Sequence, residues 1–311
     1  MELKHHLLPR LKTLRLSGIL DTIELRNRQA IEDKWSYIEF LERLIEDESE
    51  RRAQKQLELR VRRSTMTTGK TLETFDFSFN PTLNRQQLMN LATGAYLHEK
   101  RNVLICGPTG TGKTHLAQAL GHEACRQGAT VLFINTHRML QHLSGGRADH
   151  SFDRRLASYL RPDLLILDDF GLKPLSAPGP EDLYDVINER YEKGAIILTS
   201  NRAPGEWPQL FGDPLLASAG IDRLAHRAEV LIVRGESYRA QGRKKLEQEV
   251  NAKDKTTRCP LTGDSQIIIR WYAFAENHWY TFAENRWYTY GRHLTQCNHR
   301  PSDDHGTQYS D

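Results

Sequence analysis

Two adjacent carboxylates are the first residues in this sequence whose placement needs a chemical explanation. Asp168 and Asp169 directly follow the apolar run 164–167, LLIL, which has the character of a buried strand. Carboxylates that end such a strand side by side repel one another, which costs free energy unless a cation or a reaction requires them there. The pair therefore indicates a site that handles a metal ion or a proton.

A phosphate-binding sequence lies earlier in the chain. Segment 107–114 reads GPTGTGKT, which matches GxxxxGK[ST] at every position and stands between an apolar strand pattern and a helix pattern. In this motif glycines let backbone N–H groups curl around phosphates, and the lysine neutralises the β- and γ-oxygens. A Gly-rich turn before a helix is the plainer alternative, and the complete match argues against it. The predicted nucleotide-binding residues are Gly107, Pro108, Thr109, Gly110, Thr111, Gly112, Lys113 and Thr114.

The acidic pair then has an expected substrate, a nucleoside triphosphate with Mg²⁺. P-loop proteins place a metal-associated aspartate at the end of a second strand, so we assign Asp168 and the Thr114 hydroxyl to Mg²⁺. Asp169 is one residue further on, where it could take a proton from a water molecule that attacks the γ-phosphate. The alternative for Asp169 is an N-cap of the next segment. The pair favours a hydrolase, although an aspartate, one methylene shorter than glutamate, is compatible with slow hydrolysis.

Asn201 is a further candidate for the catalytic site. It follows the apolar run 195–200 and is expected at the carboxyl edge of the sheet, where ligands of open α/β sheets bind. We predict that Asn201, or Thr199 or Ser200 before it, senses the γ-phosphate or positions water. An ordinary turn at a strand end is an equally good interpretation.

Arg223 is a candidate for catalysis between subunits. It lies on a predicted helix well past the phosphate-binding and acidic motifs. An arginine in such a place can reach the nucleotide of a neighbouring subunit, and an arginine finger is worth about 10³–10⁵ in rate. The spacing leaves the alternative open that Arg223 forms a surface salt bridge with Asp222 or Glu229.

The elements that must position these residues alternate between strand and helix from about residue 86 to 235. The strand patterns are purely apolar rather than period-2, which indicates a parallel sheet covered on both faces. A helix is expected over 86–100, another from Lys113 to a break at Gly128, and another over 181–193. The predicted fold class is α/β, with strands at 102–106, 130–134, 164–169, 195–200 and 230–233.

The first 65 residues have helical spacing throughout. Gly18 is expected to break the first helix, and Ser36 with Glu39 has the form of a capping box that opens a longer one. Acidic residues near the middle of this long helix are followed by basic ones. The i,i+4 pairs Asp47 with Arg51 and Glu48 with Arg52 are expected to support the helix surface.

Composition excludes some classes of protein. No apolar run approaches the roughly 18–20 residues of a membrane span, and the first residues lack the apolar region of a secretory signal. The four cysteines, Cys106, Cys125, Cys259 and Cys297, have no metal-binding spacing and fit reduced thiols. A cytoplasmic protein is expected. The net charge of +3 permits nucleic-acid binding without arguing for it.

The order of several longer motifs resembles a known family. GPTGTGKT, LLILDDFG, IILTSNRAPGEW, GDPLLASAGIDRLAHRAEV and GESYR follow one another as in IstB proteins, the AAA+ ATPases that assist the transposase of a family of bacterial insertion sequences. The nucleotide motifs are common to AAA+ proteins, whereas GDPxLAxAxxDRLxH with GESxR is much narrower. The resemblance spans about residues 5–245, and the related proteins are helicase loaders of the DnaC and DnaI type.

The resemblance implies roles for individual residues. It places Walker A at 107–114, Walker B at Asp168 and Asp169, sensor 1 at Asn201 and an arginine finger at Arg223. Asn135 stands where some AAA+ proteins keep a polar switch for the catalytic acid, and Arg239 is a possible sensor-2 residue. The implied domains are a helical N-terminal DNA-binding and assembly domain (1–65), a linker (66–85), an AAA+ ATPase domain (86–245) and a tail (246–311).

The resemblance also implies partners. ATP would drive self-assembly into a homo-oligomer on duplex target DNA, which is bent and presented to the cognate transposase, and the transposase would stimulate hydrolysis. Independently of the family, segment 51–63, RRAQKQLELRVRR, has six basic residues and one acid and could bind DNA phosphates without sequence preference. A solvated helix face is the alternative. The rival functions are a DnaC-type helicase loader and an ATP-gated DNA-binding scaffold with little turnover.

The tail contains an aromatic repeat. Residues 270–291 read RWYAFAEN, HWYTFAEN and RWYTYG, three copies of an eight-residue unit. Stacking on bases is one interpretation and exposed β-structure is another. We favour a third hypothesis, that the reading frame has run into short terminal DNA repeats of the element. The tail would then be disordered and have no selected function, and sequencing both ends of the element for a matching DNA repeat tests this.

Overall fold

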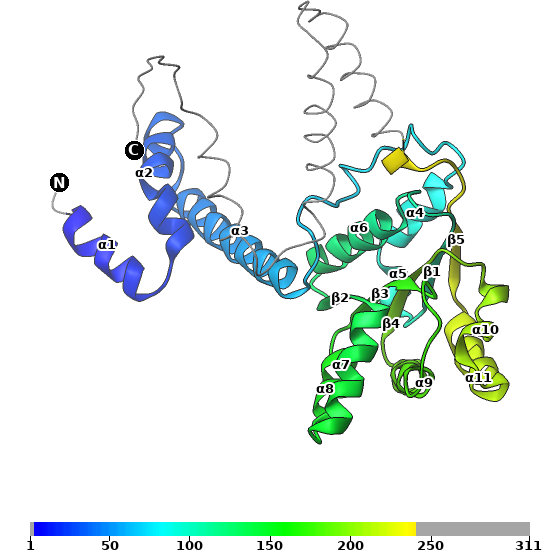
Figure 1. The fold of residues 1–311 in the computed structure, drawn as a ribbon. Helices are drawn as coiled ribbons and strands as arrows, with labels where there is room; N and C mark the ends of the chain where they lie inside the picture. The colour runs from blue at the N-terminus through cyan, green and yellow to red at the C-terminus, as the bar shows by residue number, and fades with distance from the viewer. Residues whose placement is uncertain (1–2, 241–311) are drawn as a thin grey trace, which may run out of the picture. The chain divides into compact units, whose positions relative to one another are not determined.

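Five short apolar runs form one parallel sheet in the computed structural model, which describes residues 3–240 (Figure 1). All four strand pairings are parallel, in the order β2-β3-β4-β1-β5, so the predicted α/β class is confirmed. The carboxyl ends of β1, β3 and β4 lie next to one another, which brings the motifs that follow these strands to one edge. The strands are β1 (Val103–Cys106), β2 (Val131–Asn135), β3 (Leu164–Phe170), β4 (Ala195–Ser200) and β5 (Glu229–Ile232).

Helices cover both faces of this sheet, as the apolar strands predict. Side chains alternate along each strand, so Val103 and Ile105 enter one apolar cluster while Leu104 and Cys106 enter another. Helices α4 (Arg85–Ala92) and α6 (Lys113–Arg126) pack on the first face, and α7 (Thr136–Ala148), α9 (Gly179–Arg190) and α11 (Pro214–Ala225) on the second (Figure 1). The shorter elements are α5 (Ala95–His98), α8 (Phe152–Leu160), η1 (Pro204–Glu206) and α10 (Pro208–Phe211).

The single helix expected over 86–100 is wrong. Two helices, α4 and α5, replace it, because Gly94 adopts a left-handed conformation with φ 77° that ends the first and begins the second. The helix from Lys113 ends at Arg126, and Gly128 follows it with φ 96°, so the predicted stop at that glycine is confirmed.

The first three helices are α1 (Leu3–Thr13), α2 (Ser17–Glu32) and α3 (Tyr37–Arg63). The capping box at the start of α3 is confirmed, because Ser36 accepts from the Glu39 backbone and Glu39 accepts from the Ser36 backbone. The expected break at Gly18 is wrong. The chain turns before α2, and Gly18 lies buried inside it, where a Cβ would come within 2.6 Å of Glu48 Cα on α3. This glycine serves close helix packing.

Only one of the two predicted i,i+4 ion pairs forms. Glu48 pairs with Arg52 at 2.6 Å, whereas Asp47 pairs across to Arg26 on α2 at 2.6 Å. Arg51 in turn pairs with Asp21 of α2 at 2.5 Å. The expectation failed for Asp47 and Arg51 because the opposite charges of a packed neighbouring helix satisfy them, which joins α2 to α3.

Segment 64–84 contains no helix or strand, as expected for a connecting stretch. Its first residues nevertheless bind the sheet edge: the Phe133 N–H of β2 donates to the Ser64 carbonyl at 2.8 Å, and the Thr65 hydroxyl donates to the Phe133 carbonyl at 2.5 Å. The domain boundaries at 65, 85 and 245 stay predictions. The predicted tail, with its repeat, lies outside the described residues. Within residues 3–240, no helix combines the length and apolarity needed to cross a membrane.

Candidate nucleotide-binding site

The loop between β1 and α6 has the backbone conformation that a phosphate cradle needs. Gly110 and Gly112 adopt φ 84° and 92°, the left-handed region in which glycine is favoured. A Cβ on Gly110 would lie 2.1 Å from Ser237 Oγ, so no other residue fits there without rearrangement. The loop runs directly into the amino end of α6, whose N–H groups and dipole favour an anion. The geometry fits the triphosphate of a nucleotide.

Lys113 is the buried cation of this loop. Its residue is 7% exposed, and its Nζ donates to the Pro108 carbonyl at 2.6 Å. Burial lowers the pKa of the Lys113 ammonium, while the nearby carboxylates of Asp169 and Asp168 act in the opposite direction. The lysine is therefore placed where an anion with several charges would stabilise its protonated form.

Asp168 lies behind the loop, next to the hydroxyl that was predicted to share a metal with it. Its Oδ1 accepts from Thr114 Oγ1 at 2.9 Å and from Thr199 Oγ1 at 2.6 Å, and the residue is only 6% exposed. A carboxylate beside a hydroxyl is the oxygen donor set that Mg²⁺ prefers when it also binds phosphates. The residues present fit Mg²⁺, and Thr199 orients Asp168.

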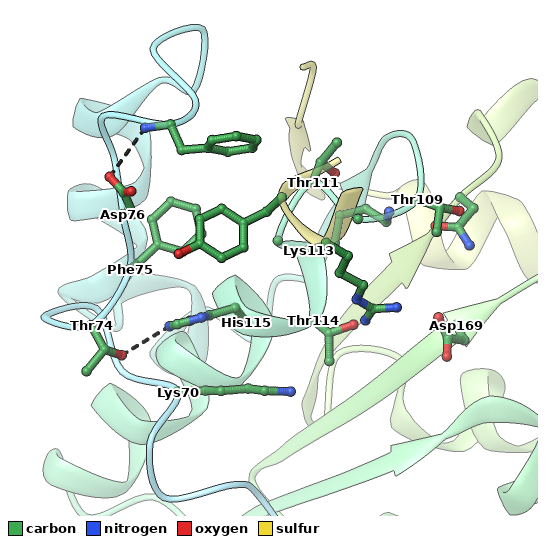
Figure 2. Close-up of a pocket in the computed structure, with 16 residues that line it drawn as sticks. Lys70, Thr74, Phe75, Asp76, Thr109, Thr111, Lys113, Thr114, His115 and Asp169 are labelled. Atoms are coloured by element: carbon green, nitrogen blue, oxygen red, sulfur yellow. Dashed lines mark hydrogen bonds between the residues drawn. The ribbon is translucent and has the colours of Figure 1, made fainter. Parts of the chain in front are cut away.

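Asp169 is directed away from Asp168 by an irregularity in β3. The β3–β4 register shifts between Leu167 and Phe170, and Asp169 has a positive φ of 56°. Such a bulge re-aims a side chain, and a non-glycine residue in this region is strained. The backbone is held there by a hydrogen bond from Asp169 N–H to Thr199 Oγ1 at 3.0 Å. Asp169 thus lines the pocket beside the phosphate loop (Figure 2).

The surroundings of Asp169 raise the pKa of its carboxyl above the ordinary value. Burial raises the pKa of the Asp169 carboxyl, and repulsion by Asp168 raises it further, while Lys113 and Arg239 lower it. Asn135, at the end of β2, donates from Nδ2 to Asp169 Oδ2 at 3.2 Å. Asn135 Oδ1 accepts from the His137 N–H at 3.1 Å, which fixes the orientation of the amide. Asp169 caps no helix of the described residues, so its alternative interpretation finds no support.

A pocket of about 380 Å³ adjoins the loop, within the size range of small-molecule sites. Asp169 and Asn201 line it together with the phosphate loop, so the structure brings these predicted residues to one place. Arg239 lines it too. The sequence patterns did not predict the wall made by Lys70, Phe75, Phe79 and Tyr238. The cluster of aromatic residues in TFDFSF was the available signal, but a segment without helix or strand period was interpreted only as a linker.

Arg223 is not part of this pocket. It lies near the end of α11, where its Nη1 donates to the Ala219 carbonyl at 2.9 Å and its guanidinium covers the Tyr184 ring. The neighbouring Leu224 carbonyl accepts from Asn102, the residue before β1, so Arg223 lies at the amino edge of the sheet, opposite the phosphate loop. Arg223 forms neither of the salt bridges that the alternative interpretation allowed, with Asp222 or with Glu229, and Glu229 pairs with Arg101 instead.

Comparisons with known proteins agree with this site. Residues 9–246 match the family described as IstB-like ATP binding protein. An ATP-binding protein in an insertion sequence of Mycobacterium tuberculosis is 43% identical over 234 residues, which cover 75% of this chain and 93% of that protein. The ATP-binding protein of insertion sequence IS21 from Pseudomonas aeruginosa is 36% identical over 241 residues, which cover 78% and 91%.

Solved structures that align with the chain include a DnaC helicase loader, at 22% identity and a TM-score of 0.42, covering 48% of this chain and 86% of that one. The family match spans most of the sequence and includes the phosphate loop, both aspartates and Asn201. It confirms the resemblance to IstB-type ATPases that the motifs indicated. This chain belongs to the IstB-like family of ATP-binding proteins and is a P-loop ATPase.

Proposed function

We propose that this ATPase is a DNA transposition helper that assembles on duplex target DNA and delivers it to a partner transposase. The observation that carries the proposal is the arrangement of the nucleotide pocket in a chain of the IstB-like family, in which Asp169 lines the pocket and Asp168 accepts a hydrogen bond from Thr114 behind the phosphate loop. A protein that used ATP only as an assembly ligand would need the phosphate loop but not the second carboxylate.

Each residue of the site has a distinct task in the proposed hydrolysis. Mg²⁺ bound with ATP supplies neutralisation of phosphate charge, and Asp168 with Thr114 would hold it. Lys113 binds the phosphate oxygens. Asp169 takes a proton from the attacking water, because it is the one of the two adjacent aspartates that lines the pocket. Asn201, which lines the same pocket, positions that water or contacts the γ-phosphate.

Arg223 acts on the nucleotide of a neighbouring subunit in this proposal. Its place at the edge of the sheet opposite its own phosphate loop supports a role in trans, because it lies away from its own pocket. Assembly would therefore complete each site, and hydrolysis would then be linked to the homo-oligomer rather than to the monomer.

The C-terminal half of α3 is the proposed DNA contact. Arg51 and Arg52 are engaged in ion pairs with acidic residues, so they contribute less free charge than the sequence suggested. Lys55, Arg62 and Arg63 are exposed on the same helix and form no ion pair within the described residues. Contacts of this kind would bind duplex phosphates with little sequence preference and with strong salt dependence.

Reconstituted transposition tests the proposal. The cognate transposase, a donor end and a random-sequence target duplex are incubated with ATP and either the unaltered chain, Lys113→Ala or a matched surface variant, Lys173→Ala. The unaltered chain and Lys173→Ala should raise target insertion, while Lys113→Ala should not bind ATP and should not stimulate. Stimulation that is equal with Lys113→Ala would contradict the proposal. Loading of a replicative helicase on single strands, without any effect on insertion, would instead identify a helicase loader.

A further inference from the structure

Lys70 is a second lysine of the nucleotide pocket that lies outside the phosphate-loop motif. It belongs to segment 64–84, is half-buried, and lines the pocket together with Thr114 and Asp169. Its side chain extends from this segment toward the side of the pocket that Thr114 and Asp169 occupy (Figure 2). The apolar part of the pocket wall, with Phe75 and Phe79, comes from the same segment.

The backbone on both sides of Lys70 is held by one hydroxyl. Thr74 Oγ1 donates to the Gly69 carbonyl at 2.8 Å and accepts from the Thr71 N–H at 3.1 Å, and these are the residues directly before and after Lys70. The Lys70 N–H itself donates to the Thr67 carbonyl at 3.3 Å. Lys70 therefore occupies a closed turn rather than a loose loop.

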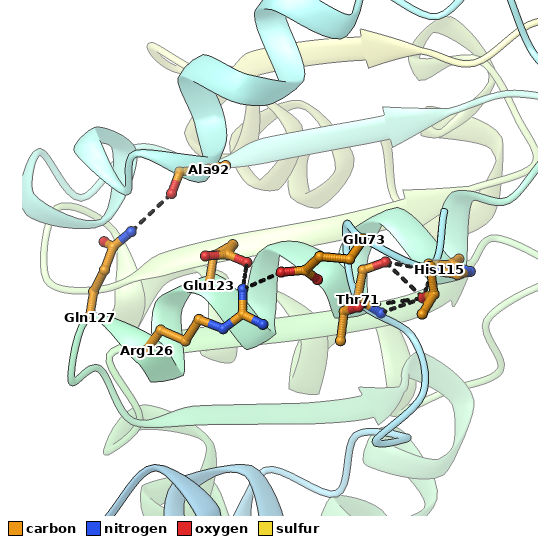
Figure 3. A network of polar contacts seen from close by, with 8 residues as sticks. Thr71, Glu73, Ala92, His115, Glu123, Arg126 and Gln127 are labelled. Carbon is orange, nitrogen blue, oxygen red and sulfur yellow. Dashed lines mark hydrogen bonds and ion pairs between the residues drawn. The ribbon is translucent and has the colours of Figure 1, made fainter. Parts of the chain in front are cut away.

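This turn is fixed to the helix that carries the phosphate-loop lysine. His115, the residue after Thr114, places its Nε2 2.9 Å from the Thr71 carbonyl and 3.3 Å from Thr74 Oγ1. Further along α6, Gln118 accepts from the Thr67 N–H at 2.8 Å. Arg126 pairs with Glu73 at 2.8 Å (Figure 3). Anchors on both sides of Lys70 thus fix its position relative to Thr114.

The ammonium of Lys70 has no counter-charge of its own. Among residues 3–240, it takes part in no ion pair or side-chain hydrogen bond, whereas Lys113 donates to Pro108. A half-buried cation at a preorganised position, open to a pocket beside the phosphate loop, is suited to an anionic ligand. Lysine is a compact point charge that binds phosphate oxygens well.

We propose that Lys70 binds the phosphate groups of the nucleotide as a second cation, supplied by the segment that joins α3 to the ATPase core. This inference rests on the nucleotide site described above and concerns a residue that the phosphate-loop motif does not include. Because the same segment begins at the end of α3, nucleotide phosphates would directly hold the connection to the N-terminal helices.

Nucleotide-binding titrations on the full chain test this. Dissociation constants for ATP and ADP, both with Mg²⁺, are measured for the unaltered chain, Lys70→Met, Lys70→Arg and the exposed-lysine control Lys173→Met. A charge-assisted hydrogen bond is worth about ten- to hundredfold in affinity, so Lys70→Met should weaken ATP binding by that factor. Lys70→Arg and Lys173→Met should stay within about threefold of the unaltered chain, because both keep the pocket cation.

The two nucleotides locate the contact. A loss for ATP alone places the ammonium at the γ-phosphate, and a loss for both places it nearer the α- and β-phosphates; each supports the proposal. Unchanged binding of both nucleotides by Lys70→Met would overturn it. So would equal weakening by Lys70→Met and Lys70→Arg, since charge would then be irrelevant. The ligand-free melting temperature checks folding, and Lys70→Gln repeats the test if the methionine variant is unstable. Failure of the transposition assay would leave these affinities unaffected.

Discussion

One irregular residue pair in β3 gives two adjacent aspartates different environments. The bulge leaves Asp168 buried between the hydroxyls of Thr114 and Thr199. Asp169, at positive φ, lines the pocket and accepts a hydrogen bond from Asn135. The sequence predicted that Asp168 binds the metal and that Asp169 acts as the base, because both aspartates end an apolar strand pattern in a chain that also has a phosphate loop. It could not predict the bulge, which depends on the hydrogen bond from Asp169 N–H to a threonine on a neighbouring strand.

Removing the charge of Asp169 tests its role as the base. Asp169→Asn should keep ATP affinity within about threefold, since Lys113, Thr114 and Asp168 are untouched. Its turnover should fall by about 10²–10⁴, the usual contribution of a general base. Phosphate release at saturating ATP measures the effect, with the exposed Asp33→Asn as the control. Turnover that stays near the unaltered value would assign Asp169 a structural role.

At the scale of elements, the segment between α3 and α4 both connects these helices and forms part of the nucleotide pocket. The absence of a helix or strand period predicted it correctly as irregular, yet it supplies one wall of the pocket through Lys70, Phe75 and Phe79. Hydrophobic periodicity predicts helices and strands that pack on a core. It cannot predict the structure of a segment that is held by side-chain hydrogen bonds. Strands β1, β3 and β4 were predictable for the opposite reason, since burial on both faces leaves continuous apolar runs.

The ion pair between Glu73 and Arg126 predicts how pH affects this segment. The hydrogen bond from Arg126 lowers the pKa of Glu73 to about 2. A lowered pKa stabilises the fold above the ordinary value of 4.5, and this contribution disappears as pH falls from there toward 2. Glu73→Gln should therefore cost about 0.2–1 kcal/mol at pH 7, as expected for an exposed pair, and progressively less below pH 4.5. Chemical denaturation at pH 7, 5 and 3.5 measures this, and a penalty that grows on acidification would contradict it.

The close packing of α2 on α3 depends on glycine at position 18, which has no side chain. A Cβ on Gly18 would lie 2.6 Å from Glu48 Cα and 2.7 Å from the Asp47 carbonyl oxygen, both backbone atoms that cannot rotate away. Gly18→Ala should destabilise the helix pair by about 1–3 kcal/mol despite alanine's better helix propensity. Gly205→Ala, which meets no atom within 4 Å, is the control. Limited proteolysis and denaturant unfolding compare them, and equal stability of the two variants would count against this packing.

At the scale of the whole molecule, the site is incomplete within one chain if Arg223 serves a neighbour. Because Arg223 lies at the amino edge of the sheet, opposite its own phosphate loop, its loss should affect turnover only where subunits are in contact. Arg223→Ala should reduce turnover by at least about 10³ in assembled protein and leave the slow turnover of dilute monomers unchanged. Steady-state hydrolysis measured across a range of protein concentrations separates the two. An equal reduction at every concentration would refute a role in trans.

ATP binding is linked to duplex DNA binding in the proposed function, and DNA binding by Asp169→Asn with and without ATP tests that link most directly. This variant should bind ATP but hydrolyse it too slowly to disassemble the oligomer. Sedimentation on matched duplex and single-stranded fragments of random sequence should show large complexes on the duplex only when ATP is present. The affinity of these complexes should fall steeply with salt. Complexes that form equally without ATP, or that prefer single strands, would contradict the proposed transposition helper.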